Sequence, residues 1–238
     1  MRSGPSLLVV VLGSSLWTPA ALVVSAAVDA HARFVANVDE AQAHLRISRE
    51  LYAAGYTAKA ALHSSHPVQE LGSRVYGPIK RADPALGERV RLLLKKPRQA
   101  IDARVPPPRY AALLAEIDQV LAGAVGRVVP KDTLETPSFQ ARVIGRLLDA
   151  VVEEYDEAWK AGRIAQDVEY HDAWGFFHQA QARAAKLPPG VAKAVSADFE
   201  ALGKAFAEVT PPAKPLPLNR VKALVQKIST ALASATAT

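Results

Sequence analysis

Long runs of helix-forming residues fill most of the chain, and proline or glycine separates each run from the next. Alanine, leucine, glutamate, lysine, arginine and glutamine dominate these runs, and such residues favour helix. The alternating β-branched runs and the Asn-Gly or Asp-Gly turns that are typical of strands are missing. Because the breaks are short, successive helices are expected to pack side by side in antiparallel order. The sequence therefore predicts an all-α protein, an up-and-down helical bundle.

The helix boundaries follow from capping residues and breaks. Asn37 has the side chain of an N-cap, and Asp83 and Thr136 are each followed by the first-turn proline of a helix start. One helix is expected to pass through Pro67 with a bend. Proline-rich hinges are expected near residues 105–108 and 211–217. The expected helices cover residues 37–54, 57–81, 84–96, 109–124, 137–161, 164–186, 191–209 and 219–233.

Residues 1–30 have the pattern of a secretory signal peptide. Arg2 supplies a positive charge, an apolar stretch starts at Leu7, and small residues then offer cleavage positions after Ala27, Ala30 and Ala32. A cut after Ala30 leaves residues 31–238 as a single helical-bundle domain without a transmembrane span, in the periplasm or secreted. The alternative is an uncleaved N-terminal anchor, since the apolar stretch is nearly long enough to cross a bilayer.

Composition narrows the classes of function. The chain has no cysteine, which excludes a disulfide scaffold and a zinc-thiolate site. The net charge of +6 is concentrated in residues 74–109, which hold ten basic against three acidic side chains. These basic residues lack interleaved aromatic side chains for stacking on bases, so a nucleic-acid partner is not expected. A solvated face is the preferred interpretation, and contact with a membrane surface or with an envelope partner is the alternative.

The histidines are the most informative polar residues, and five of the six lie on expected helices. His44 falls on the apolar side of the first helix, and His63, His66 and Glu70 follow one another at spacings of three and four. His171 and His178 are seven residues apart and share a helix face. Burying so many imidazoles is costly unless each one finds a partner.

A metal site satisfies such a group of side chains. Imidazole and carboxylate without sulfur suit divalent iron, zinc, copper or nickel, and facing helices of a bundle are a known place to hold a metal. Haem could be bound only non-covalently, because no Cys-x-x-Cys-His motif exists. The alternative is that the histidines are structural and hydrogen-bonded. The expected ligands are His44, His63, His66, Glu70, His171 and His178.

Two motifs carry a resemblance to known proteins. One is His63-x-x-His66-Pro67-x-x-Glu70, and the other is Glu169-Tyr170-x-Asp172-x-x-Gly175-Phe176. Together they resemble a group of secreted, all-helical bacterial proteins of poorly defined function, which are similar to imelysin-like periplasmic iron-uptake proteins. The resemblance covers about a third of the mature chain and implies a role in metal uptake.

The chain departs from the imelysin pattern, because its His-x-x-Glu signature is absent. The Glu-x-x-His motif of di-iron bundles and the His-Glu-x-x-His motif of zinc peptidases are absent too, so an enzyme is the less favoured class. The sequence favours a metal-binding protein for uptake or delivery, with an envelope scaffold as the alternative. The metal hypothesis requires the hairpin around Gly55 to pack against the helix of His171 and to bring that imidazole near His44 and His63.

Overall fold

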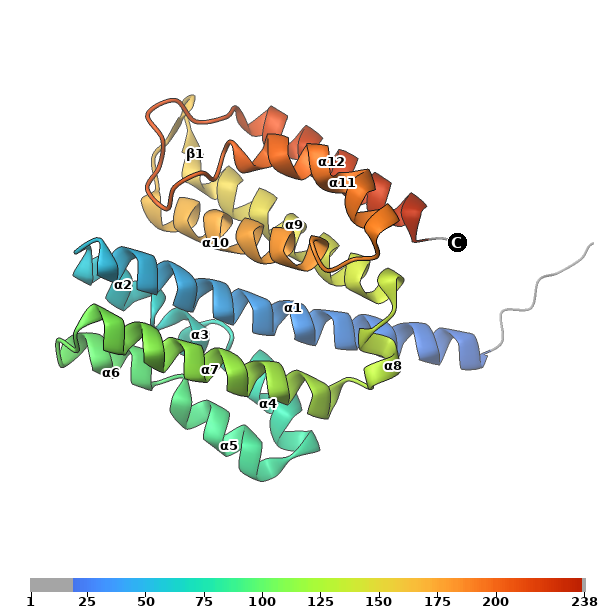
Figure 1. Ribbon diagram of the computed structural model, residues 1–238, viewed down its shortest axis with the longest axis horizontal. Helices are drawn as coiled ribbons and strands as arrows, with labels where there is room; N and C mark the ends of the chain where they lie inside the picture. The colour runs from blue at the N-terminus through green and yellow to red at the C-terminus, as the bar shows by residue number, and fades with distance from the viewer. Residues whose placement is uncertain (1–18, 237–238) are drawn as a thin grey trace, which may run out of the picture.

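The computed structural model describes residues 19–236, and these form helices joined by short connections and one pair of short strands (Figure 1). The helices of the first half are α1 (Pro19–Ala53), α2 (Thr57–His63), α3 (His66–Gln69), α4 (Gly72–Ala82), α5 (Pro84–Leu93), α6 (Lys96–Asp102) and α7 (Pro107–Val128). The second half contains α8 (Lys131–Leu134), α9 (Pro137–Ala158), β1 (Trp159–Lys160), β2 (Arg163–Ile164), α10 (Asp167–Ala184), α11 (Pro189–Gly203) and α12 (Leu218–Ala235). The predicted all-α bundle is confirmed.

Helix α1 runs through the middle of the molecule (Figure 1). It packs against α9 and α10 on one side and against α2 and α7 on the other. Buried side chains therefore surround much of its circumference, among them Val35, Val38, Leu45 and Leu51. A helix that is apolar on most sides is typical of a core position. The C-terminal helices α9 to α12 form one layer, and α2 to α7 form the other.

The expected helix start at Asn37 is wrong. Helix α1 continues through this position, and Asn37 is buried inside it. Phe34 and Val35, just before it, are buried in the core. Burial of these preceding turns stabilises helix on the N-terminal side of Asn37, and this outweighs the tendency of asparagine to cap a helix. The helix also passes through Ala30, and cleavage there stays a prediction. The first eighteen residues of the predicted signal peptide lie outside the described residues.

The expected single helix over residues 57–81 is also wrong, since α2, α3 and α4 divide it. The hydroxyls of Ser64 and Ser65 both donate to the Ala61 carbonyl, at 2.7 and 3.1 Å. Pro67 lies in the first turn of α3, where backbone N–H groups have no partner within the helix, so the missing N–H of proline costs no hydrogen bond. Proline therefore starts a helix here instead of bending one.

Smaller differences follow the same logic. Asp83 caps α5 as expected, and its carboxylate accepts a hydrogen bond of 3.0 Å from the Leu86 amide. Pro97 lies in the first turn of α6, a helix that the sequence pattern did not predict. The expected helices 137–161 and 164–186 meet in the two-residue strand pair. Ala161 and Gly162, with φ of 50° and 81°, make its turn. The proline-rich segments lie between α6 and α7 and between α11 and α12.

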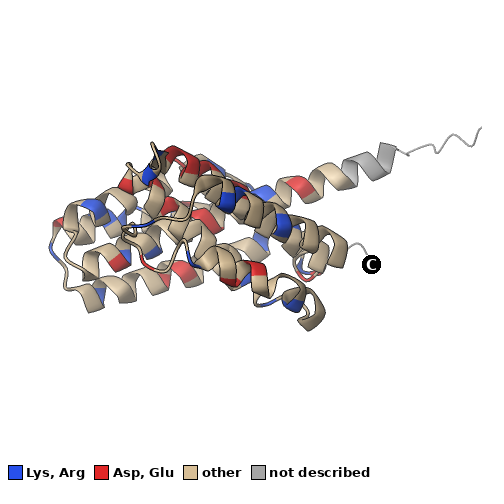
Figure 2. Ribbon diagram, turned by 90° about the horizontal axis from the view of Figure 1, so that it is seen from above, with Lys and Arg blue, Asp and Glu red and all other residues tan. Residues whose placement is uncertain are grey.

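Charge is distributed over both layers. Seen from above, basic and acidic residues are interspersed along the helices (Figure 2). None of the helices within residues 19–236 combines the length and the apolar character that a membrane-spanning segment needs.

Candidate metal centre

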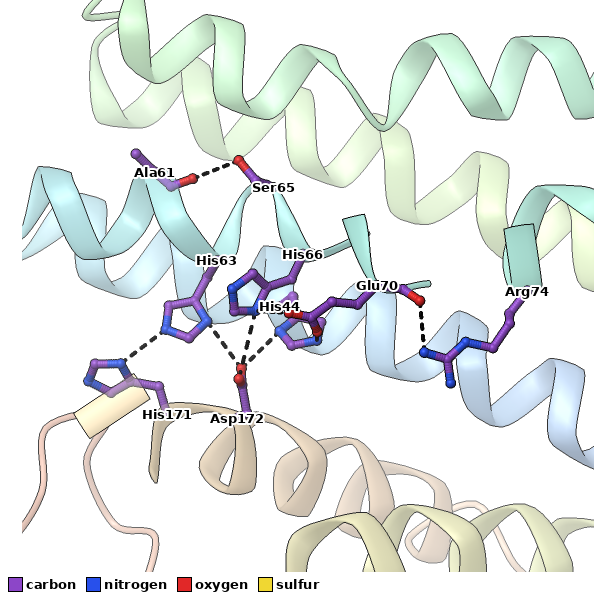
Figure 3. Close-up of polar contacts among 9 residues, drawn as sticks. All are labelled: His44, Ala61, His63, Ser65, His66, Glu70, Arg74, His171 and Asp172. Atoms are coloured by element: carbon purple, nitrogen blue, oxygen red, sulfur yellow. Dashed lines mark hydrogen bonds and ion pairs between the residues drawn. The ribbon is translucent and has the colours of Figure 1, made fainter. Parts of the chain in front are cut away.

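Four buried side chains from three parts of the chain meet between α1 and the C-terminal layer (Figure 3). His44 projects from α1, His63 ends α2, His66 begins α3, and Asp172 lies in α10. Each is at least nine-tenths buried. The break between α2 and α3 gives His63 and His66 different helix directions, and both rings point toward Asp172 (Figure 3).

The Nδ1 atoms of all three histidines face the Asp172 carboxylate. Nδ1 lies 2.8 Å from Oδ1 for His44 and 3.1 Å from Oδ1 for His63, and it lies 3.7 Å from Oδ2 for His66. One ligand atom from each of the four residues lies within 4.8 Å of all the others. Tetrahedral coordination with bonds near 2.0 Å would separate neighbouring ligand atoms by roughly 3.3 Å. The spacing therefore fits a group of ligands around one ion.

The angles at these contacts fall outside hydrogen-bond geometry, although the two shortest are ion pairs whenever the imidazole is protonated. Nδ1 of His44, His63 and His66 and Oδ1 of Asp172 are buried, and each lacks a hydrogen-bond partner of acceptable geometry among the described residues. Buried polar atoms are almost always paired, and each exception needs an explanation such as an ion. Four such atoms at one point are explained if their lone pairs face a common centre instead of one another.

The pKa values of the buried groups favour binding of a cation at this site. Burial raises the free energy of the Asp172 carboxylate, but the nearby His44 and His63 outweigh it and hold the pKa of Asp172 well below its usual range. Burial and the neighbouring His44 lower the pKa of His66 to about 4, so this ring is neutral at pH 7. For His44, burial is outweighed by Asp172, Glu70 and Glu40, which raise its pKa. The site thus offers an ionised carboxylate and a neutral imidazole, with a proton on His44 to displace.

Glu70 lies at the edge of this group. Its Oε1 is 3.7 Å from Nδ1 of His66, and its Oε2 is 4.0 Å from Nε2 of His44. The Glu70 side chain is 52 % exposed, whereas that of Asp172 is 6 % exposed. It sits at the break between α3 and α4, where its carbonyl accepts a 2.7 Å hydrogen bond from Arg74. Glu70 therefore connects the buried group with solvent.

His171 lies behind His63. Its Nδ1 is 3.0 Å from Nε2 of His63, the nitrogen that faces away from Asp172 (Figure 3). Burial, with the neighbouring His63, lowers the pKa of His171 to about 4, and its Nε2 is buried without a partner among the described residues. The hydrogen bond orients the His63 ring, and when Nε2 of His63 is the donor, Nδ1 of His63 keeps its lone pair. His171 thus supports a ligand instead of facing the centre itself.

His178 is the expected ligand that the structure does not bring to the group. It lies two turns beyond His171, where its Nε2 is 3.1 Å from the carbonyl oxygen of Phe206. Its ring packs against Trp174 and Phe177. Burial lowers the pKa of His178. These contacts are those of a core histidine, which was the alternative interpretation.

The expected packing of the hairpin is found, because α1 and α2 meet α10 and bring His63 to His171. Asp172 was not among the expected ligands. It is the aspartate of the Glu-Tyr-x-Asp-x-x-Gly-Phe motif. The glycine of this motif, three residues later, is the sequence signal that could have identified Asp172 as a residue at a helix contact. Gly175 allows α10 to approach α1 closely, so the residue one turn before it faces α1.

A second group of acidic residues lies on α9 and α10. Glu154, Glu157 and Glu169 each offer a carboxylate oxygen within 4.8 Å of the others. Burial, with the negative charge of Asp172, raises the pKa of Glu154 to about 8. Carboxylates of this kind are common on surfaces, and these three are less buried than the histidine group.

Comparison with protein families places a domain over the C-terminal layer. Residues 130–238, slightly less than half of the chain, match the family described as the iron permease-associated 4-helix bundle domain. The match spans α8 to α12, so it includes Asp172 and His171 but excludes His44, His63 and His66. Comparison with curated proteins and with solved structures finds no significant match. The chain is therefore an all-helical protein whose C-terminal part is similar to an iron permease-associated 4-helix bundle domain, and its buried His/Asp cluster fits metal binding.

Proposed function

We propose that this protein binds one divalent transition-metal ion through His44, His63, His66 and Asp172, and carries it during metal uptake or delivery. His44 comes from the central helix α1, His63 and His66 come from the N-terminal layer, and the carboxylate comes from the C-terminal layer. A bound ion would therefore join the two layers. A protein that holds and releases an ion in this way needs no further catalytic group.

The observation that carries the proposal is the set of four buried ligand atoms that find no hydrogen-bond partner of acceptable geometry within residues 19–236. A structural histidine normally directs both nitrogens to partners, as His178 does with its Nε2. Here three Nδ1 atoms converge on one carboxylate at distances down to 2.8 Å, without hydrogen-bond geometry to it or to any other described residue. An ion at their common centre would satisfy all four atoms at once.

Iron is the proposed cargo. Three imidazoles and one carboxylate suit divalent iron, zinc and copper alike, so the ligand set alone does not choose among them. The match to a domain associated with iron permeases favours iron. The predicted signal peptide supports a periplasmic or secreted location, where such cargo would be collected. An envelope protein that takes up the ion would be the physiological partner.

The test is metal binding by protein purified without a histidine tag. Wild type is expected to bind one equivalent of Fe(II), Zn(II) or Cu(II), measured by elemental analysis after dialysis and by titration calorimetry under anaerobic conditions. Asp172→Asn should weaken binding at least about tenfold, because it removes the one anionic ligand. Asp167→Asn is the matched control, since Asp167 lies in the same helix, is exposed and pairs with Lys59 at 2.7 Å.

The runner-up function is an envelope scaffold whose histidines are structural. The observation that favours it is the attraction between Asp172 and His44, which needs no metal to hold the layers together. If wild type binds none of the three metals while circular dichroism shows a folded protein, the scaffold function would be favoured over metal carriage. Bound metal with an open position occupied by water would instead indicate an enzyme.

A further inference from the structure

A cleft of about 470 Å³ lies on a different side of α1 from the histidines. Its walls come from α1, α7, α9 and α10, and α7 and α10 flank α1 (Figure 1). His44 and Arg46 are two residues apart, which turns their side chains about 200° from each other around the helix. The volume lies within the roughly 300–1,000 Å³ that small-molecule sites occupy.

Four basic side chains line this cleft, and two of them already have partners. Arg183 binds both oxygens of Asp39, with a 2.8 Å contact from Nη2 to Oδ1, and also donates a 2.8 Å hydrogen bond to Gln140. Arg49 pairs with Glu50 at 2.7 Å. The other carboxylate in the wall, that of Asp118, accepts a hydrogen bond from Gln42 at 3.3 Å, and burial raises its pKa.

Arg46 is different, because it has no acidic partner within 4.0 Å among the described residues. Its Nε is buried without a hydrogen-bond acceptor in the part of the chain that the structure describes, and its guanidinium lies 5.3 Å from the centre of the Trp174 ring. Burial and the charge of Arg49, offset in part by Glu50, lower the pKa of Arg46. The indole Nε1 of Trp174, which lies beside the cleft and not in its lining, is also buried without an acceptor among the described residues. A half-buried guanidinium without a counterion is costly, and an anion relieves that cost.

We propose that this cleft binds a small molecule with an oxyanion group, either a carboxylate or a phosphate, through the guanidinium of Arg46. The planar guanidinium offers parallel N–H donors that match two oxygens of such a group, and the Trp174 ring fixes its orientation. Lys186 is an exposed cation in the same cleft and adds attraction at the rim. This site is independent of the metal centre.

The test is titration calorimetry of the full, tag-free chain in metal-free buffer, with citrate and inorganic phosphate as separate probes. Wild type should bind at least one of them, and the stronger probe identifies the oxyanion. Arg46→Gln should weaken that binding at least about tenfold, and Arg46→Lys should recover only part of it. Arg127→Gln removes the same charge from an exposed position on α7 outside the cleft, and it should change the affinity less than about twofold. Asp172→Asn should bind the probe as wild type does.

Two results would overturn the proposal. One is the absence of binding of either probe to wild type at about 10 mM. The other is an equal loss in Arg46→Gln and Arg127→Gln, which would show that net charge alone attracts the anion. Circular dichroism checks the fold of each variant. If Arg46→Gln unfolds, Lys186→Gln replaces it, and a change below about twofold in this exposed variant would contradict the site.

Discussion

Gly175 of α10 lies so close to Ile47 of α1 that a Cβ atom at position 175 would be 2.6 Å from Cδ1 of Ile47. The same Cβ would lie 3.2 Å from the Cβ of Ala43. Asp172 is one turn before Gly175, and His44 is one turn before Ile47. The close approach of the two helices therefore sets the 2.8 Å separation between His44 and Asp172.

Gly175→Ala should separate α1 from α10 and disturb the metal centre. Ile47 is fully buried and has little room to move, so we expect a loss of about 1–3 kcal/mol in the free energy of unfolding. Metal affinity should fall with it. Gly145→Ala is the control, since this helical glycine of α9 has no atom within 4 Å of an added Cβ. The control should gain about 0.5–1 kcal/mol. Urea unfolding measures both, and equal stability of the two variants would contradict the close approach.

The sequence predicted the fold well where local signals act alone. Asp83 caps α5 as its Asp-Pro signature indicates. The prediction from sequence failed where tertiary packing overrides those signals. Asn37 is an example, because the turns before it are buried and helix α1 continues through it. For the site, the sequence placed His63 and His66 together on one continuous helix, whereas the break between α2 and α3 is what turns both rings toward Asp172. Spacing could not place Asp172, because that position depends on how closely α10 approaches another helix.

The histidines should differ in their effect on metal affinity. His44→Ala and His63→Ala each remove a ligand and should lower the affinity at least about tenfold. His171→Ala should have a smaller effect, because it removes only the 3.0 Å contact that orients His63. His178→Ala should leave the affinity unchanged, since this ring contacts the Phe206 carbonyl. Calorimetric titration of the four variants gives this order, and a loss in His178→Ala equal to that in His63→Ala would refute it.

Metal binding should release a proton near neutral pH. Burial opposes the charged form of His44, but Asp172 and Glu70 raise its pKa above the ordinary 6.5, so the metal-free ring is largely protonated up to at least that pH. An ion at Nδ1 must displace that proton, so affinity should rise with pH, by up to about tenfold per unit, until His44 is neutral. Calorimetry in buffers of different ionisation enthalpy counts the protons. Affinity that is constant between about pH 6 and 8 would contradict this assignment.

Glu70 should control the rate of exchange of the ion. As the half-exposed member of the group, it is placed to meet the ion before the buried ligands do. Glu70→Gln should slow capture at least about threefold while changing the equilibrium affinity less, because the four buried ligands remain. Stopped-flow mixing with a fluorescent chelator measures capture and release. Glu50→Gln removes a carboxylate that pairs with Arg49 and serves as the control. Equal capture rates in both variants would exclude this role.

The most direct test of the metal centre is a crystal structure of the protein with Fe(II) or Zn(II), with data collected at the absorption edge of the metal. We predict one anomalous peak between α1 and α10, within about 2.0–2.3 Å of Nδ1 of His44, His63 and His66 and of an Asp172 oxygen. A peak only at the acidic group of Glu154, Glu157 and Glu169, or no peak in a crystal soaked at saturating metal, would contradict the account.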